Sequence, residues 1–216
     1  MPQNITHRLE IIKAKGTDGV TRWIVQIPST KSWDPSAGSM LNDVTADLEE
    51  MGGQSSQLEA AVREAMRQAH IPAGADVMLT GFSLGGITAG HLASDPSFTS
   101  TYNVQAVLTG GSPIARFDIG STTQVLSLEH TDDIVPHLDG MSNPDQPNWT
   151  TYTDATPVIK DAHGNDVPAH NYVTYAQTAA EAQASGDPSV DYYTNTVRPY
   201  LDGTQTIQDY QAERVP

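Results

Sequence analysis

The chain has 216 residues, which suits a single domain able to bury a sizeable hydrophobic core. Its formal net charge is −15, so we expect neither nucleic acid as a partner nor strong attraction to anionic membrane surfaces. The absence of cysteine excludes disulfides, thiolate metal sites and a cysteine nucleophile. The amino terminus lacks a secretory pattern and no stretch approaches a membrane-spanning length, so we expect a soluble chain of open location. Because an expected strand begins within a few residues, the chain could be one domain of a longer protein.

The first predicted elements are a β-hairpin and an amphipathic helix. Apolar and polar residues alternate at 8–13 and 21–27, and Gly16-Thr-Asp-Gly19 between them favours a turn. Ser56-Gln-Leu-Glu59 then has the pattern of a helix capping box. Apolar residues repeat at helical spacing after it, until a proline and a glycine stop the run. This helix, which we expect to pack on the sheet, carries Leu58, Val62, Ala65, Met66 and Ala69.

Five residues, Gly81-Phe-Ser-Leu-Gly85, stand between a predicted strand and a predicted helix. The apolar run 76–80 precedes them, and the segment 86–93 follows with helical composition. A nucleophile elbow has this context: its serine lies on a strained strand-to-helix turn, with glycines where a Cβ atom would collide. The alternative is a glycine-rich turn whose serine only caps the helix. The flanking strand and helix favour the elbow, which makes Ser83 the candidate nucleophile.

The remaining predicted elements continue an alternation of strands and helices. Apolar runs at 104–109 and 125–128 predict two more strands, and the segment 161–166 favours a hairpin. Two stretches that contain Ala and Tyr, 172–184 and 188–201, predict helices. This alternation predicts an α/β fold, with a mostly parallel central sheet flanked by helices, in a single domain of residues 1–216.

A serine hydroxyl needs an imidazole base to attack an acyl carbon, and the histidines downstream of Ser83 are the candidates. His170 lies in a loop just before a helix, from which it can reach the carboxyl edge of the sheet, and it is the favoured base. His91 is eight residues along the elbow helix, about 12 Å up its axis and out of reach. His163 lies in an apparent turn, where solvent exposure is expected. The two others flank the expected position of the acid: His130 and His137.

The carboxylate that orients the imidazole is expected after the strand at 125–128. Thr131-Asp-Asp-Ile-Val-Pro136 follows that strand directly. The carboxyl ends of strands are where α/β sheets place functional groups, which favours Asp133 or Asp132 over acids elsewhere. The alternative is an acidic turn that only faces water.

Four segments resemble, in chain order, the class 3 lipases, a family of α/β hydrolases with the fungal triacylglycerol lipase type of core. Ile27-Pro-Ser-Thr30, followed by 43–48, takes the place of the family's F-R-G-T/S strand end and D-L helix. Gly81-Phe-Ser-Leu-Gly-Gly86 resembles G-H-S-L-G-G, with phenylalanine in place of the usual histidine. Thr109-Gly-Gly-Ser-Pro-Ile-Ala-Arg-Phe117 resembles T-F-G-S-P-R-V-G, and Asp132-Asp-Ile-Val-Pro-His-Leu138 resembles N-D-I-V-P-R-L-P.

The resemblance implies an α/β-hydrolase fold and a role for each matched residue. The aspartate before Ile-Val-Pro is the family's triad acid, which selects Asp133 over Asp132. Leu84 N–H is then one donor of the oxyanion hole, and Thr30 the second. Because this chain lacks the family's Arg-Gly pair, Ser29 stays the alternative to Thr30. Typical members carry a helical lid, for which only 31–41 are available here, so we expect a minimal lid: a short flap with Trp33, Met40 and Leu41.

Together these residues predict a serine hydrolase of the esterase or lipase type. Ser83 would attack the ester, His170 would transfer protons and Asp133 would orient the imidazole, with no metal or cofactor. The expected partner is a small-molecule or lipid ester of short to medium acyl length, and the oligomeric state stays open. Two alternatives remain: a thioesterase or acyltransferase with the same triad, and a non-catalytic hydrolase-like module of a larger protein.

Overall fold

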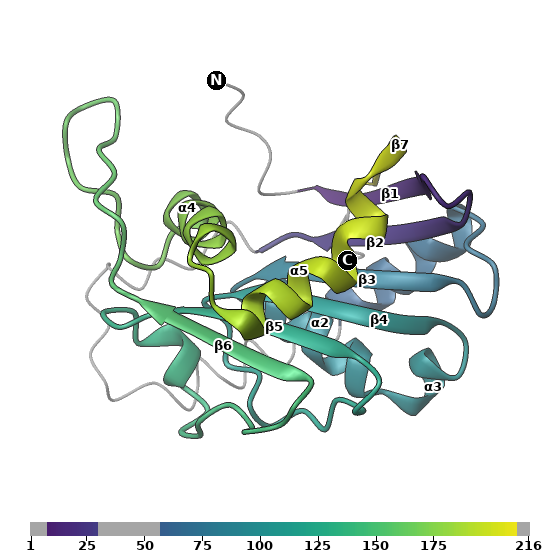
Figure 1. Ribbon diagram of the computed structural model, residues 1–216, viewed down its shortest axis with the longest axis horizontal. Helices are drawn as coiled ribbons and strands as arrows, with labels where there is room; N and C mark the ends of the chain where they lie inside the picture. The colour runs from purple at the N-terminus through teal and green to yellow at the C-terminus, as the bar shows by residue number, and fades with distance from the viewer. Residues whose placement is uncertain (1–7, 30–56, 211–216) are drawn as a thin grey trace.

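A seven-stranded sheet with helices on both faces forms the centre of the molecule (Figure 1). The computed structural model describes residues 8–29 and 57–210. The strands are β1 (Leu9–Gly16), β2 (Thr21–Ile27), β3 (Asp76–Phe82), β4 (Asn103–Gly110), β5 (Gln124–His130), β6 (Trp149–Asp154) and β7 (Gly203–Tyr210). Their order across the sheet is β6-β5-β4-β3-β2-β1-β7.

The strands of this sheet run in one direction with a single exception. Neighbours from β2 to β6 are parallel, whereas β1 is antiparallel to both β2 and β7. The prediction of a mostly parallel sheet is therefore confirmed, as is the β1–β2 hairpin. Because parallel strands end at the same edge, the loops after β3, β5 and β6 emerge beside one another. These loops lead to the segments that hold Ser83, Asp133 and His170.

Helices cover the two faces of the sheet in separate layers. A helix at residues 57–68, α2 (Leu84–Ser94) and the short α3 (Pro96–Thr99) lie on one face. On the other face lie α4 (Tyr172–Ala184) and α5 (Pro188–Leu201), and Figure 1 shows α5 crossing in front of the strands. The bounds of α4 and α5 match the predicted helices. A single 3-10 turn, η3 (Val135–His137), follows β5.

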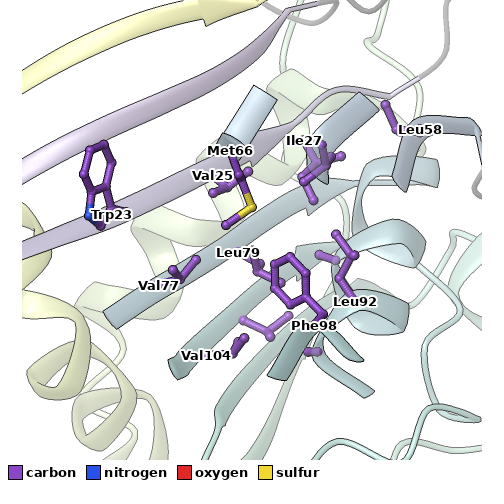
Figure 2. Close-up of a cluster of buried hydrophobic side chains, with 14 of the residues drawn as sticks. Trp23, Val25, Ile27, Leu58, Met66, Val77, Leu79, Leu92, Phe98 and Val104 are labelled. Carbon is purple, nitrogen blue, oxygen red and sulfur yellow. The ribbon is translucent and has the colours of Figure 1, made fainter. Parts of the chain in front are cut away.

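Two apolar layers result, one on each face of the sheet. The cluster in Figure 2 joins side chains of β2, β3 and β4 to the 57–68 helix, α2 and α3, with Met66, Leu92 and Phe98 among its buried members. The second cluster joins the opposite side of the same strands to α4 and α5, through Tyr175 and Tyr200 among others. Burial of both faces is the expected state of a parallel sheet.

Several features differ from the sequence-based expectations. Strands β6 and β7 and helix α3 were not anticipated. The hairpin predicted at 161–166 is a turn closed by one antiparallel bridge, Lys160 to Asp166. Thr30, the flap at 31–41 and the helix expected at 43–48 lie outside the described residues. In the described part of the chain, none of the helices has both the length and the apolar character needed to cross a membrane.

Candidate active site

Ser83 lies on a strained turn between β3 and α2. Its φ is 53° and its ψ is −122°, a conformation that residues with a side chain rarely adopt. Its N–H donates to Gly110 O at 2.9 Å, and its carbonyl accepts from Gly86 and Ile87 N–H. The Ser83 hydroxyl makes no capping hydrogen bond although the residue is the N-cap of α2. The capping alternative therefore does not describe this serine.

Glycines make this turn sterically possible. A Cβ atom added to Gly81 would overlap the backbone of Gly85, and one added to Gly85 would overlap the carbonyl of Ile27. The same holds for Gly86, whose Cβ would overlap the Ser112 side chain. The expectation of glycines where a Cβ would collide is confirmed at the first two positions and extends to the third.

The hydroxyl of Ser83, the imidazole of His170 and the carboxylate of Asp133 form one hydrogen-bonded line. His170 Nε2 lies 3.0 Å from Ser83 Oγ, and His170 Nδ1 lies 2.7 Å from Asp133 Oδ2. Because a carboxylate can only accept, Nδ1 carries the proton toward Asp133 and Nε2 can accept the serine proton. Ser83 is 4% exposed, and the side chains of His170 and Asp133 are 7% and 2% exposed. The line is thus shielded from bulk water.

Three donors converge on the Asp133 carboxylate. Oδ1 accepts from Val135 N–H at 3.0 Å, and Oδ2 accepts from the Tyr175 hydroxyl at 2.8 Å as well as from His170. Burial alone would raise the pKa of Asp133, but these hydrogen bonds and the nearby imidazole outweigh burial and lower the pKa. Asp133 is therefore an ionised acceptor at neutral pH.

Tyr175 stays a donor because burial, with the adjacent Asp133 charge, raises the pKa of its hydroxyl far above its ordinary value. The tyrosine oxygen also accepts from His130 N–H at 3.2 Å. It thus links the end of β5 to the carboxylate beyond it. Sequence reasoning did not identify Tyr175, since one tyrosine on an amphipathic helix has the pattern of an ordinary core residue.

His130 holds the loop that carries His170. Its ring stacks on Tyr175 with centroids 3.9 Å apart, and its Nδ1 lies 2.9 Å from Ala169 O. A carbonyl oxygen only accepts, so this Nδ1 is protonated. His130 Nε2 lies 2.7 Å from the Thr178 hydroxyl of α4. A fully buried histidine therefore ties β5 to α4 and to the residue before His170.

Local capping fixes the approach of His170 from the α4 side. Asn171, the N-cap of α4, accepts a hydrogen bond from Val173 N–H through its side chain. The helix therefore begins two residues after His170. The Phe82 ring packs against the imidazole, with the two ring centroids 4.7 Å apart. Asn171 thus fixes the backbone next to His170, and Phe82 packs against its ring.

The remaining sequence candidates lie away from Ser83. His91 pairs with Glu59 on the outer side of α2, and His163 is exposed in its turn, as expected. His137 is half exposed on η3, with its Nε2 4.0 Å from Glu129. Asp132 accepts hydrogen bonds from Thr156 and does not contact the imidazole. The structure thus brings His170 and Asp133 to the serine, and none of these alternatives.

For the oxyanion hole, the described residues supply one candidate donor at the helix start. Leu84 is the first residue of α2, where N–H groups have no acceptor within the helix. Ser29 lies just beyond the carboxyl end of the neighbouring strand β2, whereas Thr30 is outside the described residues. Among the described residues, no group of three or more His, Asp or Glu side chains is arranged to hold a metal ion.

Comparison of the chain with protein-family models, with curated proteins and with solved structures found no match. The resemblance to class 3 lipases therefore rests on the four matching segments alone.

Proposed function

We propose that this protein is a serine hydrolase with an α/β-hydrolase fold that cleaves carboxylic esters through an acyl-enzyme. The observation that carries the proposal is the buried line from Ser83 through His170 to Asp133. Each residue lies at or beyond the carboxyl end of a parallel strand, and each distance is within hydrogen-bond range. A nucleophile, a base and an orienting carboxylate in this arrangement are the parts that acyl transfer needs.

In the proposed first step, Ser83 Oγ attacks the ester carbonyl carbon while His170 Nε2 takes the hydroxyl proton. The resulting oxyanion is bound by Leu84 N–H, with Thr30 or Ser29 as the second donor. Asp133 stabilises the imidazolium through Nδ1–H and does not take its proton. When the intermediate collapses, the bond to the alcohol oxygen breaks and His170 protonates the leaving alcohol.

The acyl group is then carried on Ser83 as an ester. In the second step water attacks this ester, with His170 as the base, and the carboxylic acid leaves as the serine hydroxyl reforms. A thiol ester substrate or an acceptor other than water would use the same residues. Adding alcohol acceptors to the assay measures how the acyl-enzyme divides between water and other nucleophiles.

Covalent labelling tests the proposal directly. A fluorophosphonate should modify the wild-type protein at Ser83, and p-nitrophenyl butyrate should be hydrolysed with a rate that labelling abolishes. Ser83→Ala should lose both properties while it keeps its fold, because the hydroxyl makes no capping bond. Ser94→Ala, at the other end of α2, is the matched control and should behave as wild type. Absence of labelling in a folded wild-type protein would favour the non-catalytic module instead.

A further inference from the structure

Part of the central sheet is only partly buried on the α4 side. In a parallel sheet covered on both faces, side chains of central strands are expected to be buried. On this face Met78 of β3 and Ala106 of β4 are buried, whereas Phe82 and Leu108, further toward the carboxyl edge, are only partly buried. The helical layer formed by α4 and α5 therefore covers the first half of these strands more fully than the second half.

A cavity of about 190 Å³ lies at this partly buried part of the sheet. Its floor consists of the last residues of β2, β3 and β4, among them Thr80 and Leu108. Its wall is the face of α4 formed by positions spaced three, four and seven residues apart: Tyr172, Tyr175, Ala176 and Ala179. The two alanines make room, because larger side chains at their positions would extend into the cavity.

The cavity adjoins the candidate active site through backbone neighbours of Ser83. Phe82 precedes the serine in the chain, and Gly110 accepts the Ser83 N–H. Both residues line the cavity, as does Ser29 beside the expected oxyanion hole. Ser83 itself does not line the cavity, so a group attached to a carbonyl carbon at Ser83 Oγ would reach it past Phe82, at the end of β3.

The dimensions of the cavity limit the group that it can hold. A dry cavity of roughly 150 Å³ holds one benzene molecule, so this space suits a group slightly larger than a benzene ring. The cavity extends across the sheet from β3, past β2, to Arg8 beside β1. The distance between β3 and β1 is two strand spacings, or roughly 10 Å. There Arg8 pairs with Asp209 at 3.0 Å, and this ion pair forms a polar end. A hydrocarbon chain that extends in this direction meets these charges.

We propose that this cavity binds a compact apolar group of the ester substrate and so sets the size of substrate that the protein accepts. The inference rests on the proposed function, since it assigns the cavity to the same reaction. The group belongs either to the acyl part or to the alcohol part of the ester. Two ester series distinguish these sources: one varies the acyl group of p-nitrophenyl esters from two to twelve carbons, and the other varies the alcohol of acetate esters.

Filling the cavity from α4 is the decisive perturbation. Ala176→Phe puts a ring into the wall at an exposed position, and Ala180→Phe makes the same change one helical turn further on, at a residue outside the cavity lining. In one of the two series, Ala176→Phe should lower kcat/KM for esters whose varied group has four to six carbons. The loss should be about tenfold or more, relative to the ester of the same series whose varied group has two carbons. The Ala180→Phe variant should keep the wild-type profile. Thermal melting of both variants checks that each is folded.

Enlarging the cavity should have the opposite effect. Leu108→Ala removes side-chain volume from the floor and should move the optimum of the same series to longer groups. The role of the cavity would be overturned if neither substitution changed the dependence of kcat/KM on group size. An equal loss of kcat/KM on all esters, including the smallest, would overturn it as well. Such a result leaves the proposed function to its own test, because fluorophosphonate labelling of Ser83 does not depend on the size profile.

Discussion

Replacing Asp133 by Asn tests whether the buried carboxylate orients the imidazole. The carboxylate accepts from Val135 N–H, the Tyr175 hydroxyl and His170 Nδ1–H. An amide has one accepting oxygen and one NH₂ group, so it cannot satisfy donors on both sides. With its oxygen toward Val135, the NH₂ group faces His170, which must then accept at Nδ1 and carry its proton on Nε2. That tautomer cannot take the Ser83 proton.

The magnitude of the loss follows from this tautomer change. In a Ser-His-Asp triad, the same substitution lowers kcat by about 10⁴-fold, which corresponds to roughly 5 kcal/mol of transition-state stabilisation. Acid stability changes as well. Because the pKa of Asp133 in the folded protein is lowered, its carboxylate stabilises the fold above the unfolded value of about 4. That contribution disappears as the pH falls through the folded pKa, and Asp133→Asn lacks this part of the acid dependence.

The neighbouring aspartate provides the matched control. Asp132→Asn removes a surface carboxylate that bonds Thr156, so it should change the hydrolysis of p-nitrophenyl butyrate by less than about threefold. Initial rates at neutral pH, circular dichroism and thermal melting of the two variants complete the comparison. Full activity of folded Asp133→Asn, or a larger loss in Asp132→Asn, would refute the assignment of the acid.

Three further substitutions and one control test the residues around Ser83, His170 and Asp133. Tyr175→Phe removes a donor to Asp133, so the pKa of that carboxyl should rise. The stability that the ionised carboxylate provides should then be lost at a higher pH during acid unfolding, and an unchanged acid unfolding curve would contradict this role. The same variant should lose about 2 kcal/mol of stability, or roughly 4–8 °C in Tm. Gly86→Ala should cost about 1–3 kcal/mol in urea unfolding, whereas Gly120→Ala, in open space, should cost little. His130→Phe keeps a ring but loses the bond to Ala169, so kcat should fall more than KM changes, and a pure KM effect would argue against positioning.

Local patterns in the sequence predicted much of the fold and the serine-bearing turn. Alternation, capping residues and the glycines around Ser83 act over a few residues, and the hairpin, the elbow and both carboxyl-terminal helices follow from them. His170, the histidine chosen from the sequence, is the one that contacts Ser83 and Asp133. A loop that precedes a helix at the carboxyl edge can direct a side chain across the sheet. The choice of Asp133 over Asp132 needed the family resemblance, since both follow the same strand.

Strand β7 and the hydrogen bonds of Tyr175 and His130 depend on contacts between residues far apart in the sequence, which no local pattern indicates. Strand β7 is exposed along most of its length and, among the described strands, pairs only with β1, so its sequence lacks the apolar alternation of a buried strand. The bonds of Tyr175 to Asp133 and of His130 to Ala169 each join residues about forty positions apart. Such pairs are set by the packing of α4 against β5, and only the folded chain shows them.

The strand between the serine and the acid explains how the imidazole can join them. Strand β4 lies between β3, which ends before Ser83, and β5, which ends before Asp133. A side chain at the end of β4 would occupy the space in which the imidazole lies. The chain instead has glycines at positions 110 and 111. A Cβ on Gly111 would lie 3.1 Å from His170 Cε1 and 3.0 Å from the Tyr175 ring. The glycines of the Thr109-Gly-Gly-Ser112 segment have no side chain. The imidazole of His170 therefore has room to lie over the end of β4 and to contact both Ser83 and Asp133.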